Sequence, residues 1–147
     1  MNSKTDFISI NIAIVTISDS RTLKDDKSGE VLEQRVIKSG HKISSREIVK
    51  DDFNKISKLF TNLINNQEID VIISTGGTGL TGRDITPEVM ETLFEKSIDG
   101  FGEMFRWLSF SKIGTSALQS RALAGVSSGT YIFCLPGSPS ACKDGWD

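Results

Sequence analysis

The sequence predicts an α/β fold: a three-layer α/β/α sandwich with a mainly parallel sheet. Apolar strands alternate with helical segments along the chain, an order that places parallel strands between two layers of helices. Two of the apolar runs, residues 71–73 and Thr130–Leu135, each lead into a glycine-containing turn and then a helix start. The 147 residues suffice for one domain with a substantial core, so we expect a single domain over residues 1–147.

The first strand is expected over residues 12–17. Isoleucines alternate from Ile8 to Ile14 and then merge into a continuous apolar run, which is typical of a strand buried on both faces. Four polar residues follow it, Ser18-Asp19-Ser20-Arg21. The carboxyl ends of parallel strands are where ligands bind in such sheets, although a plain surface turn would also explain these residues.

A helix over residues 30–39 follows, and Gly40 is its expected C-terminal glycine. His41, the only histidine, comes next. It has no cluster of partner ligands, so we expect a structural role and neither catalysis nor metal binding. A second strand is predicted over residues 42–50.

The helix after this strand has the clearest amphipathic pattern in the chain. Asp51 and Asp52 precede it, and helix capping alone would explain an acid at this point. Its apolar residues recur at helical spacing: Phe53, Ile56, Leu59, Phe60, Leu63 and Ile64. We therefore predict a helix that packs one face against the sheet.

The chain is most aromatic in its second half. The next helix is expected to be interrupted at Gly100 and Gly102, before an aromatic stretch over residues 101–110. Core packing explains most of these aromatic residues. Trp107 and Phe110 lie off the apolar stripe and suit a subunit interface.

Three further elements complete the prediction. Residues 114–125 are expected to form a short helix of small residues, and Thr130–Leu135 a strand. Ser138 and Pro139 then occupy the N-cap and first position of a last helix. That helix stops after barely two turns at Asp147, so we expect the C-terminal helix to be truncated.

Composition excludes several classes of protein. Lys plus Arg number 17 and Asp plus Glu 19, giving a net charge of −2 with both signs scattered. This balance argues against nucleic acid or an anionic membrane as a main partner. The two cysteines fit neither a metal site nor a disulfide framework, and no apolar run is long enough to span a membrane. We expect a cytoplasmic protein.

The most informative stretch joins the strand at residues 71–73 to a helix start at Thr86-Pro87-Glu88. Proline at the first helical position, an acid in the first turn and the Thr86 hydroxyl as cap indicate that start. The loop between contains Gly76, Gly77, Gly79 and Gly82, which permit positive φ and close approach of a ligand. Strand, glycine loop and helix N-terminus together form a common phosphate-binding arrangement.

Two familiar phosphate motifs fail in this loop. Residues 77–82 match G-x-G-x-x-G, but the helix starts only at Thr86, and no strand-ending acid follows near residues 99–103. The P-loop spacing is also present, yet Arg83 and Asp84 replace its Lys and Ser/Thr. A carboxylate beside phosphate needs a cation between the two. Asp84 therefore predicts a Mg²⁺–phosphate site, unless it only shapes the turn.

Five motifs occur together in the order seen in one protein family. They are Ser18-Asp-Ser-Arg21, Asp26-Lys-Ser-Gly29, Ser74-Thr-Gly-Gly-Thr-Gly-Leu-Thr-Gly-Arg-Asp-Ile-Thr-Pro-Glu88, Leu118-Gln-Ser-Arg-Ala122 and Pro136-Gly-Ser-Pro139. Through these motifs the chain from Ile12 onward resembles the molybdopterin-binding MoaB/Mog family. Residues 100–110 and 113–121 are most similar to its B branch.

The resemblance implies a step in molybdenum cofactor biosynthesis: transfer of AMP from Mg-ATP to the terminal phosphate of molybdopterin, with release of pyrophosphate. The nucleophile would be a phosphate, already anionic at neutral pH, so no Ser-His or Cys-His pair is required. Catalysis would then consist of positioning and charge neutralisation by Mg²⁺. A non-catalytic molybdopterin-binding scaffold is the alternative. The family's assemblies imply a homotrimer or homohexamer.

The resemblance also implies the site residues. The two essential carboxylates of the family correspond to Asp51 and Asp84, which are expected to be catalytic and to bind Mg²⁺. The matching motifs imply that substrates contact Ser18, Asp19, Ser20, Asp26, Ser28, Gly29, Thr75, Gly76, Gly77, Thr78, Gly79, Arg83, Ser120, Arg121, Gly137 and Ser138.

Overall fold

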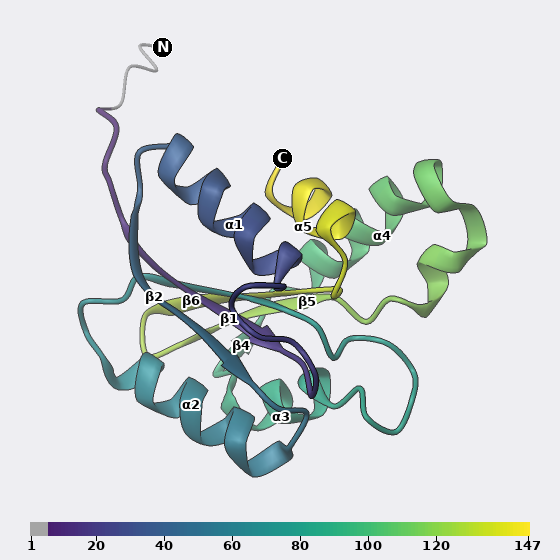
Figure 1. Ribbon diagram of the computed structural model, residues 1–147, viewed down its shortest axis with the longest axis horizontal. Helices are drawn as coiled ribbons and strands as arrows, with labels where there is room; N and C mark the ends of the chain where they lie inside the picture. Colours follow the sequence, from purple (N-terminus) through teal and green to yellow (C-terminus); the bar gives the residue numbers. More distant parts are fainter. Residues whose placement is uncertain (1–5) are drawn as a thin grey trace.

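A six-stranded sheet organises the computed structural model, which describes residues 6–147 (Figure 1). The strands are β1 (Asn11–Ile17), β2 (Lys42–Val49), β3 (Val71–Thr75), β4 (Lys96–Ser97), β5 (Leu123–Ser127) and β6 (Thr130–Leu135), in the spatial order β2-β1-β3-β6-β5-β4. Strands β2, β1, β3 and β6 pair in parallel, whereas β5 is antiparallel to β6 and β4 to β5. The prediction of a mainly parallel sheet is confirmed.

Helices cover both faces of this sheet. In Figure 1, α1 (Lys27–Lys38), α4 (Asp99–Ile113) and α5 (Pro139–Trp146) lie above the sheet, and α2 (Phe53–Asn65) and α3 (Thr86–Leu93) lie below it. A short 3₁₀ helix, η1 (Gly114–Gln119), follows α4. The predicted three-layer α/β/α architecture is therefore confirmed. Within residues 6–147, no helix is both long enough and apolar enough to cross a membrane.

The core consists of two layers because the central strands are buried on both faces. Successive side chains of a strand point to opposite faces. Accordingly, Ala13 and Val15 of β1 pack with α2 and α3, whereas Ile12 and Ile14 pack with α1, α4 and α5. Phe60 of α2 is fully buried in the first layer. The amphipathic stripe that predicted α2 is thus its sheet-facing side.

The prediction of a helix over residues 114–125 is wrong. The 3₁₀ helix η1 ends at Gln119, and β5 forms a hairpin with β6 instead. The turn residues Ser128 and Gly129 both have positive φ, 50° and 80°, as the two-residue turns of tight hairpins require. Gly125 also fits the strand, because a Cβ there would lie 2.4 Å from the Phe94 ring. Strand pairing and this close packing override the local preference of small residues for helix.

Two local predictions about helix boundaries also need correction. The interruption between α3 and α4 falls at residues 94–98, where β4 pairs with β5, and Gly100 and Gly102 lie inside the first turn of α4. At the start of α3 the Thr86 hydroxyl does not cap the helix. It donates instead to the Gly76 carbonyl oxygen at 3.0 Å, so the helix start is attached to the glycine loop. By contrast, Ser138 caps α5 as predicted.

Candidate functional site

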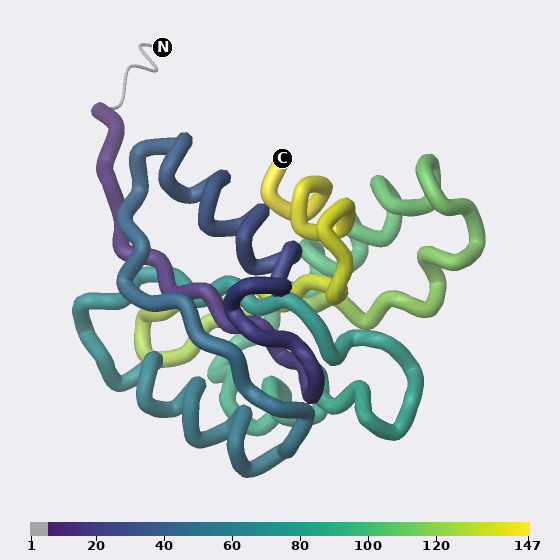
Figure 2. The backbone as a smooth tube through the Cα atoms, in the orientation of Figure 1, coloured from purple at the N-terminus to yellow at the C-terminus, as the bar shows by residue number. Residues whose placement is uncertain are grey.

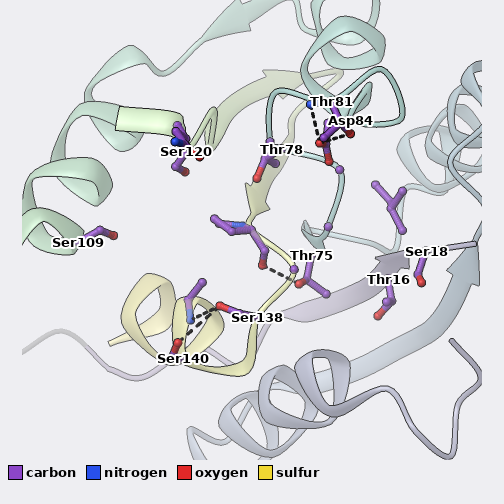
Figure 3. Close-up of a pocket in the computed structure, with 18 of the residues that line it drawn as sticks. Thr16, Ser18, Thr75, Thr78, Thr81, Asp84, Ser109, Ser120, Ser138 and Ser140 are labelled. Atoms are coloured by element: carbon purple, nitrogen blue, oxygen red, sulfur yellow. Dashed lines mark hydrogen bonds between the residues drawn. The ribbon is translucent and has the colours of Figure 1, made fainter. Parts of the chain in front are cut away.

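A cavity of about 580 Å³ opens at the carboxyl ends of the parallel strands β1, β3 and β6 (Figure 3). This is the edge at which ligands bind in sheets of this type. Figure 2 shows the loop after β3, in teal, extending past the end of the sheet. The predicted site residues that line the cavity are Ser18, Asp51, Thr75, Gly76, Gly77, Thr78, Gly79, Arg83, Asp84, Ser120, Gly137 and Ser138.

The glycine loop forms one wall of the cavity, and its conformation requires glycine at two positions. Gly76 has φ of +106° and Gly77 has φ of +74°. A Cβ on Gly76 would lie 2.3 Å from the carbonyl oxygen of Ile17, so the loop backbone crosses directly over the end of β1. The amide of Gly76 donates to Leu135 at 2.9 Å, and that of Thr86 donates to Gly77 at 3.1 Å. These contacts fix the base of the loop.

Asp84 lies at the far end of this loop and is held in its ionised form. Its Oδ2 accepts hydrogen bonds from the Thr81 amide at 3.0 Å and the Thr81 hydroxyl at 2.7 Å (Figure 3). Partial burial disfavours the charge, but the hydrogen bonds from Thr81 and Gly79 and the nearby charge of Arg121 outweigh it. The pKa of Asp84 therefore lies below the ordinary value of 3.8.

Asp51 follows β2 and is shifted in the opposite direction. Burial raises its pKa above the ordinary 3.8, the charges of Asp19 and Asp84 raise it further, and Arg83 only partly offsets them. The Asp51 amide donates to the Asp19 carboxylate at 3.0 Å. A Cβ on Gly77 would lie 3.6 Å from Asp51 Oδ1, so this carboxylate faces the glycine loop. It does not cap α2, because Asp52 does so through the Lys55 amide.

This excess of negative charge beside a glycine loop fits a divalent cation. The negative charges of Asp19 and Asp84 both raise the pKa of Asp51, and the exposed Arg83 is the counter-charge, paired with Asp19. In the part of the chain that the structure describes, no cluster of three or more His, Cys, Asp or Glu side chains could hold a metal alone. Magnesium rarely needs such a cluster, since one or two carboxylates plus substrate phosphates usually hold it. Asp51 and Asp84 fit that arrangement.

The raised pKa of Asp51 predicts a stability gain on removing its charge. The folded protein holds the Asp51 proton more tightly than the unfolded chain, so the stability contributed by this group is fully present below pH 3.8 and is lost as pH rises above 3.8 through the raised pKa. Because Asp51 is partly exposed, solvent screens much of this effect, so Asp51→Asn should raise the free energy of unfolding at pH 7 by no more than about 0.5 kcal/mol and should give little gain below pH 3.8.

Urea unfolding of both proteins between pH 3 and pH 7, with a chelator present, measures this difference. A variant that is less stable than the parent at pH 7, or a difference that does not vary with pH, would contradict the proposed burial and repulsion at Asp51.

The opposite wall of the cavity contains residues that the sequence did not predict. Lys112, Ser109 and Ser116 come from α4 and η1, and Asp144 comes from α5. Lys112 Nζ and Asp144 Oδ1 are 2.5 Å apart and join the two helices at the cavity. In the sequence, the one indication of these residues was that polar side chains interrupt the mostly aromatic stretch that forms α4. Ser109, Ser120, Ser138 and Ser140 give this side of the cavity a lining rich in hydroxyl groups (Figure 3).

Six predicted site residues do not line the cavity: Asp19, Ser20, Asp26, Ser28, Gly29 and Arg121. Asp19 lies just behind Asp51, as described above. Asp26 is buried beneath the site, where its carboxylate caps α1 through the Gly29 amide at 2.9 Å. The Ser28 hydroxyl donates to the Gly137 carbonyl oxygen at 3.2 Å and so supports the cavity from below. Arg121 contacts the backbone of the glycine loop.

Comparisons with known proteins agree with one another. Residues 13–147 match the model of a probable molybdopterin binding domain. The chain is 45% identical over 143 residues to molybdenum cofactor biosynthesis protein B of Escherichia coli K12, covering 97% of this chain and 84% of that protein.

Solved structures agree as well. A crystal structure of a molybdenum cofactor biosynthesis protein B is similar with a TM-score of 0.92 and 41% identity, over 95% of this chain and 88% of that one. The tungsten cofactor synthesizing protein MoaB from Pyrococcus furiosus is similar with a TM-score of 0.84 and 33% identity, over 94% and 88% of the two chains.

Proposed function

The chain belongs to the family of probable molybdopterin binding domains, and we propose that it acts in molybdenum cofactor biosynthesis by adenylylating molybdopterin. The substrates are molybdopterin and ATP with Mg²⁺. One observation carries the proposal: two carboxylates, Asp51 and Asp84, lie at a glycine loop that can bind phosphate, and their pKa values are shifted in opposite directions. Perturbed pKa values cluster at functional sites, and one or two carboxylates together with substrate phosphates are the usual ligands of Mg²⁺.

The reaction needs little proton transfer. An oxygen of the terminal phosphate of molybdopterin attacks the α-phosphorus of ATP, a new P–O bond forms, and the bond to the β-phosphate oxygen breaks. Pyrophosphate leaves with the electron pair. Bound Mg²⁺ would neutralise charge on the transferring phosphates. The nucleophile is anionic at neutral pH, and His41, the one histidine of the sequence, does not line this cavity.

Each wall of the cavity has a role in this proposal. The amides of Gly77 and Thr78 bind phosphate oxygens, and Asp51 and Asp84 hold the cation against them. Arg83 and Lys112 provide positive charge for the anionic substrates. The side rich in hydroxyl groups suits the polar edges of a pterin.

Incubation of the purified chain with molybdopterin and Mg-ATP, followed by measurement of pyrophosphate and of the adenylylated product, tests the proposal directly. We expect stoichiometric formation of both products, dependent on Mg²⁺. Molybdopterin binding that is unaffected by Mg-ATP, with no product, would establish the alternative of a non-catalytic scaffold.

We also propose that a second copy of the chain covers α4, giving a homotrimer or homohexamer. Met104, Trp107 and Phe110 of this helix are 63%, 72% and 56% exposed. Aromatic residues and methionine are enriched at subunit interfaces, and exposed apolar residues clustered in this way mark such surfaces.

A single charge introduced on this face should disrupt such an assembly. Trp107→Asp is expected to reduce the mass measured by light scattering from that of three or six chains to that of one chain, because the aspartate charge would be buried in the interface. Tyr131→Asp is the matched control, because Tyr131 is an aromatic residue 49% exposed on β6. A parent protein that is monomeric at micromolar concentration, or an unchanged mass for Trp107→Asp, would contradict the proposal.

A further inference from the structure

Arg121 contacts the backbone of the glycine loop and the side chain of Glu88. These contacts differ from those expected of a residue that binds substrate. Arg121 Nε donates to the Gly79 carbonyl oxygen at 2.8 Å and Arg121 Nη2 to the Asp84 carbonyl oxygen at 2.6 Å. The guanidinium also pairs with Glu88 in the first turn of α3, and its Nη2 donates to Glu88 Oε1 at 3.1 Å. These contacts occupy the guanidinium, and Arg121 does not line the cavity.

The glycine loop depends on Arg121 to an unusual degree. Within residues 6–147, every hydrogen bond that joins residues 78–84 to the rest of the chain comes from Arg121, including the one that its amide donates to the Thr78 carbonyl oxygen at 2.9 Å. Among the described residues, the one further polar contact between this segment and another part of the chain is the ion pair between Arg83 and Asp19, which is 3.6 Å long and largely exposed. The loop tip is otherwise exposed, with Leu80 at 66%.

The backbone that carries Arg121 is itself fixed. Arg106 of α4 donates to the Ser120 carbonyl oxygen at 3.3 Å and to the Ala122 carbonyl oxygen at 3.0 Å, on either side of Arg121. Because a guanidinium is planar and its donors have fixed directions, two carbonyl oxygens bound to one arginine are held at a fixed separation. The carbonyl oxygens of Gly79 and Asp84 are the two ends of the turn that presents the Asp84 carboxylate.

We infer that Arg121 is a positioning residue, which sets the place of the Asp84 carboxylate relative to the loop amides and does not contact substrate. The inference rests on the proposed function for its effect on catalysis. The effect of Arg121 on the loop conformation does not depend on the proposed function. Glu88 acts with Arg121, because the carboxylate aligns the guanidinium with the loop. Charge alone is therefore not enough at position 121, and a lysine cannot make both carbonyl contacts in this geometry.

The first measurement needs no substrate. Hydrogen exchange of the amides at residues 78–84 should become about tenfold faster in Arg121→Lys and Arg121→Gln, because hydrogen bonds from a charged donor are lost. Arg35→Gln is the matched control, since Arg35 is 30% exposed and ion-paired, as Arg121 is at 31%, but lies on α1 and pairs with Asp147. Its loop exchange should equal that of the parent.

The second measurement separates positioning from substrate binding. In both Arg121 variants kcat should fall about tenfold and more Mg²⁺ should be needed, whereas KM for molybdopterin should stay within about twofold. If Arg121→Lys exchanges and reacts like the parent while Arg121→Gln loses molybdopterin affinity, Arg121 binds substrate through its charge and the inference is wrong. If the parent forms no product, the adenylyl transfer proposal fails, and exchange alone then decides the positioning role.

Discussion

Asp84→Asn is expected to lower kcat for adenylyl transfer by a factor of about 100 or more, with a much smaller change in KM for molybdopterin. The amide keeps the size of the side chain and can still accept hydrogen bonds from Thr81. It carries no charge, so it cannot help to hold a cation against the phosphates on the glycine loop. The variant would therefore stabilise the transition state less than the parent does, because the charge on those phosphates changes most at that point of the reaction.

Asp52→Asn is the control for this experiment. Asp52 is adjacent to Asp51 in the chain but caps α2 and does not line the cavity. Asparagine is as good an N-cap as aspartate, so both stability and kcat should be close to those of the parent. A kcat for Asp84→Asn within a few-fold of the parent would contradict the role assigned to Asp84.

The largest loss of stability is expected from Asp26→Ala, about 3 kcal/mol. The side chain is fully buried, and its Oδ2 accepts from the Thr16 hydroxyl at 2.6 Å and lies 3.3 Å from Arg46 Nη2. Removing the carboxylate would leave the Arg46 guanidinium, 15% exposed, with the more distant Glu33, 3.6 Å away, as its one ionic partner among the described residues. It would also remove the cap of α1.

Chemical unfolding of Asp26→Ala and Asp25→Ala provides the comparison. Asp25 is exposed and its side chain accepts one hydrogen bond, from the Thr22 amide, so its replacement should cost no more than about 1 kcal/mol. Equal losses for the two variants would contradict a structural role for Asp26. An Asp26→Ala protein of parental stability that binds molybdopterin weakly would restore the original prediction that Asp26 contacts substrate.

Elements whose sequence pattern depends only on neighbouring residues could be predicted from the sequence. The apolar run of β1, the stripe on α2 and the Ser138-Pro139 start of α5 each depend on neighbouring residues, and all three are confirmed. The rejection of both familiar phosphate motifs is supported as well, since α3 begins at Thr86 and Gly82 lies in the exposed part of the loop.

Elements that depend on distant partners could not be predicted in this way. Strand β5 has a sequence of small residues and exists because it pairs with β6 and accommodates Phe94 at Gly125. The same holds for side chains at the site. Asp26 and Asp84 are both acids in polar segments, yet one is buried beneath the sheet edge and the other faces the cavity. Lys112 joins the cavity only because α4 packs against α5.

Diffraction from crystals of the protein grown with Mn²⁺ and an ATP analogue whose α,β-bridge cannot be cleaved tests the central claim most directly. The anomalous signal locates the metal, which is expected about 2.1 Å from carboxylate oxygens of Asp51 and Asp84, as for magnesium. The phosphates should contact the amides of Gly77 and Thr78, which line the cavity. A bound nucleotide whose metal lies away from both carboxylates, or whose phosphates lie away from these amides, would contradict the proposed site.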